Sequence, residues 1–191
     1  MEPLRIHKMV PVSEVNGPGK RAVIWFQGCS LGCAGCWNPE TWDAESAGHE
    51  TPMWAVLEWL KGTLKENPEL EGITFSGGEP MQQPTWLYLL IVAIRRQYPH
   101  LSIGLFSGYA DSELTRRMWW EAIRKRIDFA VLGRYNAQQP AHDPLVTSRN
   151  QALRLYSDRY TAADFQPQAI EVTIDGNGLT QLTGFPTKGG I

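Results

Sequence analysis

The sequence has only three cysteines, and all of them lie in one short stretch, at Cys29, Cys33 and Cys36. An odd number of cysteines in a tight cluster is a poor disulfide framework. Long apolar runs are also lacking, because the longest, near Trp86–Ile94, is too short to span a bilayer. The first residues do not follow the basic, apolar, small-residue order of a signal peptide. We therefore expect a cytoplasmic protein with no membrane partner.

Excess charge of either sign is absent as well, since the formal net charge is -2 over 191 residues. This near-neutral balance gives no reason to expect a nucleic-acid partner. A local basic cluster surrounds Trp119 and Trp120, and we interpret it as the solvated face of an amphipathic helix. Hydrophobic residues make up 42% of the chain, which is ordinary for a globular protein. The length suits a single domain, 1–191, with a sizeable core.

Apolar runs and helical spacings alternate along the first two thirds of the chain. The expected strands are 21–27, 72–76, 101–106 and 128–132, and the expected helices are 51–64, 85–98 and 112–126. This alternation predicts an α/β fold with a parallel sheet. The units are too few for a closed eight-stranded barrel, which needs about 250 residues. We therefore expect an incomplete parallel (β/α) barrel, followed by a C-terminal β-hairpin in which 170–174 and 179–182 flank Asp175–Gly178.

The three cysteines have the spacing Cys-x3-Cys-x2-Cys. Thiolates are soft ligands that suit iron–sulfur clusters or zinc. Three thiolates leave one iron of a four-iron cubane without a protein ligand, free to bind another molecule. Two alternatives stay open at this point: a zinc site completed by His49, and a set of cysteines with a purely structural role.

A second motif, Gly77-Gly78-Glu79-Pro80, follows the strand predicted at 72–76. Two glycines leave backbone groups open to a ligand, and Glu79 adds an acceptor for an ammonium group. The cysteines, this motif, Ser107-Gly108 and Gly133-Arg134 each follow a predicted strand. Because ligands in parallel sheets bind beyond the carboxyl ends of the strands, we expect all four segments to meet at one active site.

The cysteine triplet and the Gly-Gly-Glu-Pro segment resemble the two best-known motifs of the radical S-adenosylmethionine (SAM) superfamily. A longer ordered series resembles the activating enzymes of anaerobic ribonucleotide reductase. It comprises Asn16-Gly17-Pro18-Gly19, Gly35-Cys36-Trp37-Asn38, Ser107-Gly108-Tyr109, Gly133-Arg134-Tyr135 and Arg149-Asn150-Gln151. The resemblance covers a core of about 15–151 and leaves 152–191 as a C-terminal extension. Two segments depart from that group: the acid usual before Gly133 is missing, and the segment 147–151 is altered.

The resemblance implies a radical SAM oxidoreductase whose cofactors are a [4Fe–4S] cluster and SAM. Cys29, Cys33 and Cys36 would hold the cluster. The SAM site would be formed by Gly35, Cys36, Trp37, Gly77, Gly78, Glu79, Ser107 and Asn150, with Glu79 near the methionyl amino group.

The implied activity is the anaerobic formation of a glycyl radical on a partner enzyme, with anaerobic ribonucleotide reductase as the expected partner. The implied electron donor is a flavodoxin or ferredoxin. Two alternatives remain at this stage: a radical SAM enzyme that modifies a small molecule or peptide, and a zinc-binding interaction module without catalysis.

Overall fold

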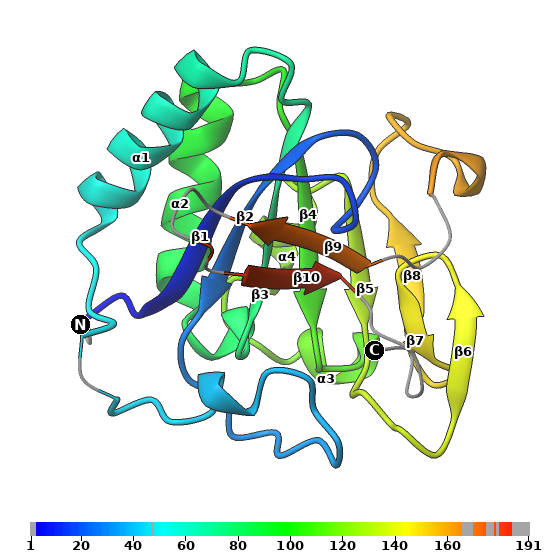
Figure 1. The fold of residues 1–191 in the computed structure, drawn as a ribbon. Coiled ribbons are helices and arrows are strands. Elements are labelled where there is room, and N and C mark those ends of the chain that lie inside the picture. The colour runs from blue at the N-terminus through cyan, green and yellow to red at the C-terminus, as the bar shows by residue number, and fades with distance from the viewer. Residues whose placement is uncertain (1–2, 47, 166–169, 175–177, 179, 185–191) are drawn as a thin grey trace.

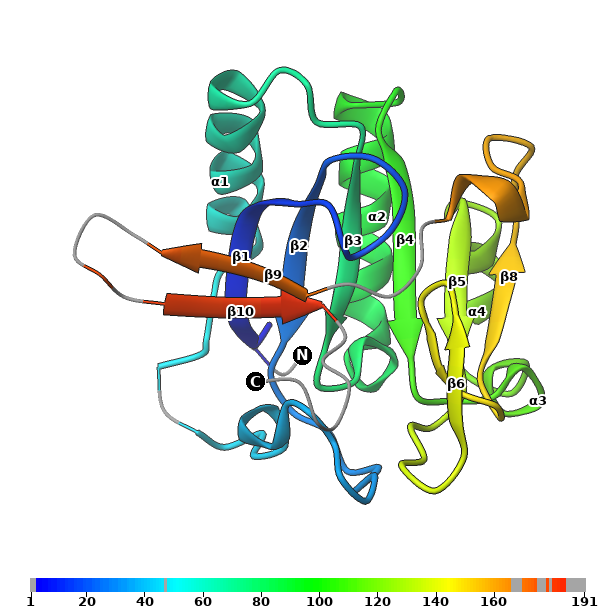
Figure 2. The same ribbon diagram turned by 45° about the vertical axis from the view of Figure 1, so that its right-hand side comes forward.

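A six-stranded mixed sheet forms the centre of the computed structural model, which describes residues 3–46, 48–165, 170–174, 178 and 180–184 (Figure 1). The strands lie in the order β1 (Ile6–Ser13), β2 (Arg21–Phe26), β3 (Gly72–Gly77), β4 (Ser102–Ser107), β5 (Phe129–Leu132) and β8 (Ala152–Leu155), side by side in Figure 2. Strands β2 to β5 are parallel, as predicted, whereas β1 and β8 pair antiparallel at the two edges. The α/β class with a parallel-rich sheet is thus confirmed, and the two antiparallel edge strands were not predicted.

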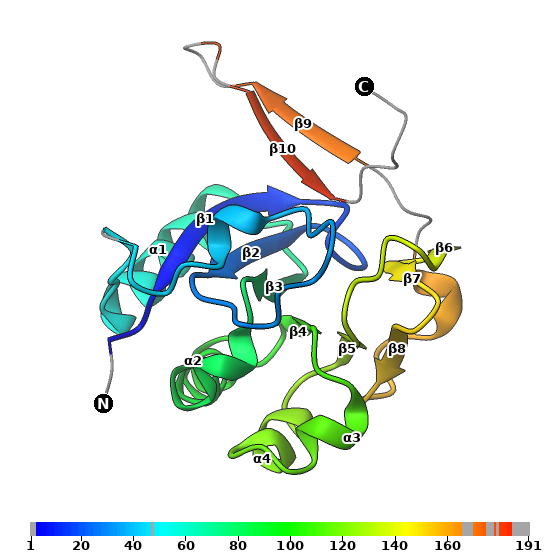
Figure 3. The same ribbon diagram turned by 90° about the horizontal axis from the view of Figure 1, so that it is seen from below.

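The helices cover one face of this sheet (Figure 3). They are α1 (Met53–Glu66), α2 (Pro84–Gln97), α3 (Asp111–Leu114) and α4 (Trp120–Arg124). Val56 and Leu60 of α1 recur at helical spacing, as do Leu87 and Leu90 of α2, and all four are fully buried in the core. Within the described residues, no helix has the length and apolar character needed to cross a bilayer.

The prediction of one continuous helix over 112–126 is wrong. The segment forms two short helices: α3 already ends at Leu114, and Trp119, the residue directly before α4, has a φ of 67°. A left-handed residue with a bulky side chain interrupts the helical hydrogen bonds. The Trp119 ring stacks on Tyr88 of α2 with a centroid distance of 4.4 Å, and its indole N–H donates to Thr85 at 3.2 Å. A tertiary contact that local spacing does not reveal therefore lies directly before the start of α4.

Two small antiparallel pairs lie outside the main sheet. Strands β6 (Pro140–Asp143) and β7 (Val146–Ser148) form one pair. Strands β9 (Ile170–Ile174) and β10 (Thr180–Gly184) form the other, and of the turn predicted between them only Gly178 lies within the described residues. The β9–β10 pair crosses the face of the sheet opposite the helices (Figures 1 and 3), and Asn16 Nδ2 donates to Thr183 Oγ1 at 2.7 Å.

The guanidinium of Arg21 is fully buried at the amino end of the parallel strands. It donates to Thr74 Oγ1 at 2.8 Å, to Ser102 Oγ at 2.8 Å and to the carbonyls of Pro18 and Ile73 at 2.9 and 3.0 Å. These bonds join β2, β3, β4 and the loop before β2. Burial lowers the pKa of Arg21, which reflects the cost of keeping a cation away from water.

Arg21→Met is expected to lower the free energy of unfolding of the metal-free protein by about 3 to 5 kcal/mol, because buried oxygens of β3, β4 and the loop before β2 would lose the guanidinium donor. The matched control is Lys20→Met, which removes a neighbouring exposed cation that pairs with Glu69 at 3.4 Å. That change should cost less than about 1 kcal/mol. Urea titrations of both variants measure the difference, and equal stabilities would contradict the role given to Arg21.

Candidate functional site

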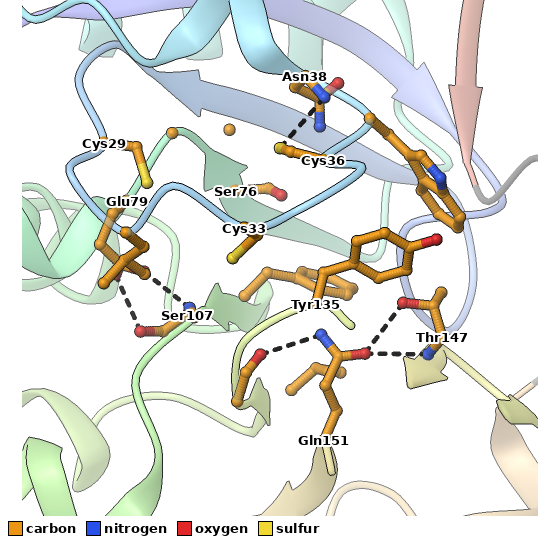
Figure 4. Close-up of a pocket in the computed structure, with 18 of the residues that line it drawn as sticks. Cys29, Cys33, Cys36, Asn38, Ser76, Glu79, Ser107, Tyr135, Thr147 and Gln151 are labelled. Carbon is orange, nitrogen blue, oxygen red and sulfur yellow. Dashed lines mark hydrogen bonds between the residues drawn. The ribbon is translucent and has the colours of Figure 1, made fainter. Parts of the chain in front are cut away.

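The loops that follow β2, β3, β4 and β5 surround one pocket at the carboxyl edge of the sheet (Figure 4). Seven of the residues predicted for the site line this pocket together: Cys29, Cys33, Cys36, Trp37, Gly77, Gly78 and Glu79. Ser107, at the end of β4, is an eighth. The parallel register of β2, β3 and β4 brings these strand ends together, as expected.

The backbones of the cysteine loop and the Gly-Gly-Glu-Pro loop lie unusually close. Gly78 N–H donates to Phe26 O at 2.8 Å, and Glu79 N–H donates to Gly28 O at 2.9 Å. A Cβ at Gly78 would lie 2.5 Å from Gly28 O, and Gly77 has a φ of 103°. The two glycines line the pocket, but the packing of the protein's own backbone already requires them. A bulky substitution at Gly78 would therefore displace the cysteine loop as well as any ligand.

Glu79 is a completely buried carboxylate at the base of the pocket. Its oxygens accept from Met81 N–H at 2.8 Å, Ser107 Oγ–H at 2.9 Å and Gly108 N–H at 2.7 Å. Burial raises the pKa of Glu79 to about 7, although these three donors partly offset that effect. A cationic group beside this buried carboxyl group would stabilise its ionised form. The carboxylate is therefore suited to receive an ammonium group.

The three cysteine thiols are half-buried and each has a backbone N–H nearby. Asn38 N–H donates to Cys36 Sγ at 3.5 Å, and backbone groups of Leu31 and Tyr135 bond Cys29 and Cys33. Burial raises the pKa of Cys29 to about 11, so the metal-free thiol stays protonated at neutral pH. The chemistry of this donor set fits an iron–sulfur cluster, since such clusters are held by thiolates and tuned by hydrogen bonds to sulfur.

His49 lies away from the three cysteines. Its Nδ1 is 3.1 Å from Ile6 O, its ring stacks with His7, and it does not line the cysteine pocket. Among the described residues, no three His, Cys, Asp or Glu side chains are close enough to hold a single metal ion. This geometry contradicts the zinc tetrahedron that His49 would complete.

The far wall of the pocket contains residues that were not predicted as site residues. The Tyr135 ring lies 5.1 Å from the Trp37 ring, and Thr147 and Gln151 complete the wall. Gln151 Oε1 accepts from Thr147 N–H at 3.0 Å, and its Nε2 donates to Gly133 O at 3.0 Å (Figure 4). Tyr135 and Gln151 belong to the ordered series that resembles activating enzymes, and Thr147 and Gln151 belong to the altered segment 147–151.

Asn150 and Gly35, both predicted for the SAM site, line a neighbouring depression instead of the cysteine pocket. Asn150 Nδ2 donates to Arg134 O at 2.7 Å, which ties the segment after β7 to the loop after β5. Gln151, one residue further along, is the side chain that faces the pocket.

Comparison with known proteins agrees with this donor set. The family described as a 4Fe-4S single cluster domain matches residues 15–154. The chain belongs to this family. Its cysteine loop and the strand-end loops around it all lie within the matched residues.

Similar sequences include pyruvate formate-lyase-activating enzymes. The chain is 35% identical to that of Clostridium pasteurianum over 132 residues, which cover 67% of this chain and 51% of the relative. It is 29% identical to that of Staphylococcus aureus strain USA300 over 131 residues, covering 66% and 51%. The chain thus spans about half the length of these relatives. The resemblance to radical SAM activating enzymes is confirmed.

The stability of the metal-free protein is expected to depend on pH through Glu79. Its folded pKa of about 7 lies above the ordinary value of 4.5, so its contribution is fully present below pH 4.5 and is lost as the pH rises through 7. Relative to Glu79→Gln, the unfolding free energy of the wild type should fall by up to about 3 kcal/mol between pH 4.5 and 8.

Urea titrations across this pH range measure the effect. The control is Glu58→Gln, at an exposed residue of α1, which should keep the wild-type profile. Parallel pH profiles for the wild type and Glu79→Gln would contradict the assignment.

Proposed function

We propose that this chain is a radical SAM enzyme that makes a glycyl radical on a partner protein. The observation that carries the proposal is the single pocket that brings three cysteines together with the buried carboxylate of Glu79. The 4Fe-4S family match and the activating-enzyme relatives support it.

In this proposal Cys29, Cys33 and Cys36 hold a [4Fe–4S] cluster, and Glu79 receives the ammonium group of SAM. Gly77, Gly78, Trp37 and Ser107 line the space beside them. When bound and reduced, the cluster supplies the electron that splits SAM into methionine and a 5′-deoxyadenosyl radical.

The protein's own residues bind, orient and exclude water. Ser107 and two backbone N–H groups fix the Glu79 carboxylate before SAM arrives, so the bound ammonium group has one position. The paired rings of Trp37 and Tyr135 cover the pocket from the side. A covered pocket protects a reactive radical from side reactions with solvent.

The proposal treats 1–191 as one cytoplasmic radical SAM domain with an incomplete (β/α) barrel, in which 152–191 is an extension. Four parallel strands with the helices on one face of the sheet support this architecture (Figure 3). The partner is a glycyl radical enzyme. The ordered motifs favour anaerobic ribonucleotide reductase, whereas the relatives are named for activating pyruvate formate-lyase. A flavodoxin or ferredoxin would supply the electron.

A second candidate, the modification of a small molecule or peptide, is favoured by a cavity beneath the β9–β10 pair. This cavity of about 230 Å³ shares Trp37, Asn38, Ser76 and Phe106 with the cysteine pocket, and Ile170 and Leu182 of the pair close it. Lys8 lines it, with its ammonium group 4.5 Å from the Trp25 ring. A space of this size holds a small organic group.

Anaerobic reconstitution of the wild type is expected to give about four irons and four sulfides per chain. Cys33→Ala should lose the cluster, because two thiolates cannot hold it. Ala34→Ser, a change at an exposed neighbour in the same loop, should keep it. Iron and sulfide analysis with electron paramagnetic resonance (EPR) tests this. Stoichiometric zinc without iron would contradict the proposal.

The reduced protein is expected to convert SAM into 5′-deoxyadenosine, which chromatography measures. Glu79→Gln should raise the KM for SAM by about 10- to 100-fold, because it removes a charged hydrogen bond to the ammonium group. Mixing the reduced, SAM-loaded protein with anaerobic ribonucleotide reductase or pyruvate formate-lyase should give the EPR doublet of a glycyl radical on one of them. SAM cleavage without a radical on either enzyme would favour the small-molecule candidate.

A further inference from the structure

The side chain of Gln82 joins three loops of the site. Gln82 ends a short 3-10 turn, Pro80–Gln82, directly after the Gly-Gly-Glu segment. Its Oε1 accepts from Ser30 N–H at 3.1 Å, and its Nε2 donates to Ser30 Oγ at 2.8 Å and to Tyr109 Oη at 3.0 Å. Ser30 belongs to the cysteine loop after β2, and Tyr109 to the loop after β4. One amide group therefore connects the loops after β2, β3 and β4.

The Tyr109 end of this connection is held firmly. Tyr109 is buried, and the guanidinium of Arg117 lies 3.5 Å from the centre of its ring. Arg134 lies 5.6 Å from the same ring and bonds both oxygens of Glu113, at 2.6 and 2.9 Å. The hydroxyl that meets Gln82 is thus part of a packed group of aromatic and charged side chains. Because Gln82 bonds both residues, it holds Ser30 in a fixed position relative to Tyr109.

Ser30 is the residue directly after Cys29, so its N–H lies in the peptide group that leaves Cys29. The N–H of Cys29 itself donates to Trp42 O at 3.0 Å. With the Gln82 bond in place, both peptide groups that flank Cys29 are hydrogen-bonded. Elsewhere in the loop, Cys36 N–H donates to Cys33 O at 3.0 Å, and Thr41 N–H and Trp42 N–H donate to Asn38 O and Pro39 O, each at 3.1 Å.

We propose that Gln82 is a positioning residue for Cys29, which sets the place and orientation of that thiol before the cluster is bound. Preorganisation of this kind matters because small errors in the position of a reacting group have large effects on rate. Only an amide supplies both the acceptor that Ser30 N–H needs and the paired donors that meet two hydroxyls. The inference rests on the proposed function only in taking Cys29 as a cluster ligand.

The first test uses the metal-free protein. Gln82→Leu keeps most of the side-chain volume but removes all three hydrogen bonds, so amide hydrogen exchange at Ser30 should become about tenfold faster. Gln97→Leu, at an exposed residue of α2, is the matched control and should leave exchange unchanged. Tyr109→Phe should give a smaller increase, and combining it with Gln82→Leu should add nothing further. Unchanged Ser30 exchange in Gln82→Leu would overturn the proposal.

The second test uses the reconstituted protein. In Gln82→Leu we expect a bound cluster whose reduced EPR spectrum is altered in the presence of SAM, and a 5′-deoxyadenosine yield reduced by about tenfold. A wild-type spectrum and yield in Gln82→Leu would overturn the role in positioning. Absence of a cluster from the wild type would instead refute the proposed function, and the exchange experiment would still decide what Gln82 does to the loop.

Discussion

The close approach of the Gly28 and Gly78 backbones is the constraint on which the rest of the site depends. Parallel pairing of β2 and β3 aligns Phe26 with Gly77, so the two loops leave the sheet at the same level. Gly28 O accepts from Glu79 N–H at 2.9 Å, which leaves no room for a Cβ at Gly78. This contact directs the Glu79 side chain inward, where Ser107 at the end of β4 and Gly108 directly after it can reach the carboxylate. The buried carboxylate therefore follows from the backbone packing.

The parallel part of the fold was predictable because its signals are local. Strands β2 to β5 are continuous apolar runs, buried on both faces by helices on one side and other segments on the other. In the edge strand β1 only Ile6, Val10 and Ser13 are buried, at irregular spacing, and β8 is short with two exposed residues, so neither produced such a run. The break at Trp119 depends on stacking against Tyr88, thirty-one positions away in the sequence. Local spacing carries no information about that contact.

The residues of the site likewise fall into a group that the sequence predicts and a group that only the structure reveals. The cysteines, the glycine pair and Glu79 form motifs of fixed spacing, so the sequence alone predicts them as site residues. Gln82 and Gln151 have no such spacing, and each acts by hydrogen bonds to segments that only the folded chain brings near. The resemblance implied Asn150 for the SAM site, whereas the adjacent amide, Gln151, lines the cysteine pocket. Side-chain direction in an irregular loop depends on the backbone that surrounds it.

The two candidate substrates differ in whether the β9–β10 pair must move before they can bind. A small molecule can use the cavity beneath this pair as it stands. A glycine loop of a partner enzyme needs the pair to move, because Leu182 and Ile170 close the cavity that leads to Trp37. An isolated two-stranded hairpin has marginal stability, and side-chain bonds such as those from Asn16 to Thr183 and from Glu14 N–H to Glu171 contribute about 1 kcal/mol each. The free energy released when two proteins associate is larger than the contribution of these bonds. Val172 and Ile174 share the face of the pair that carries Ile170 and Leu182, and both are exposed, so displacing the pair against a partner would also bury apolar surface.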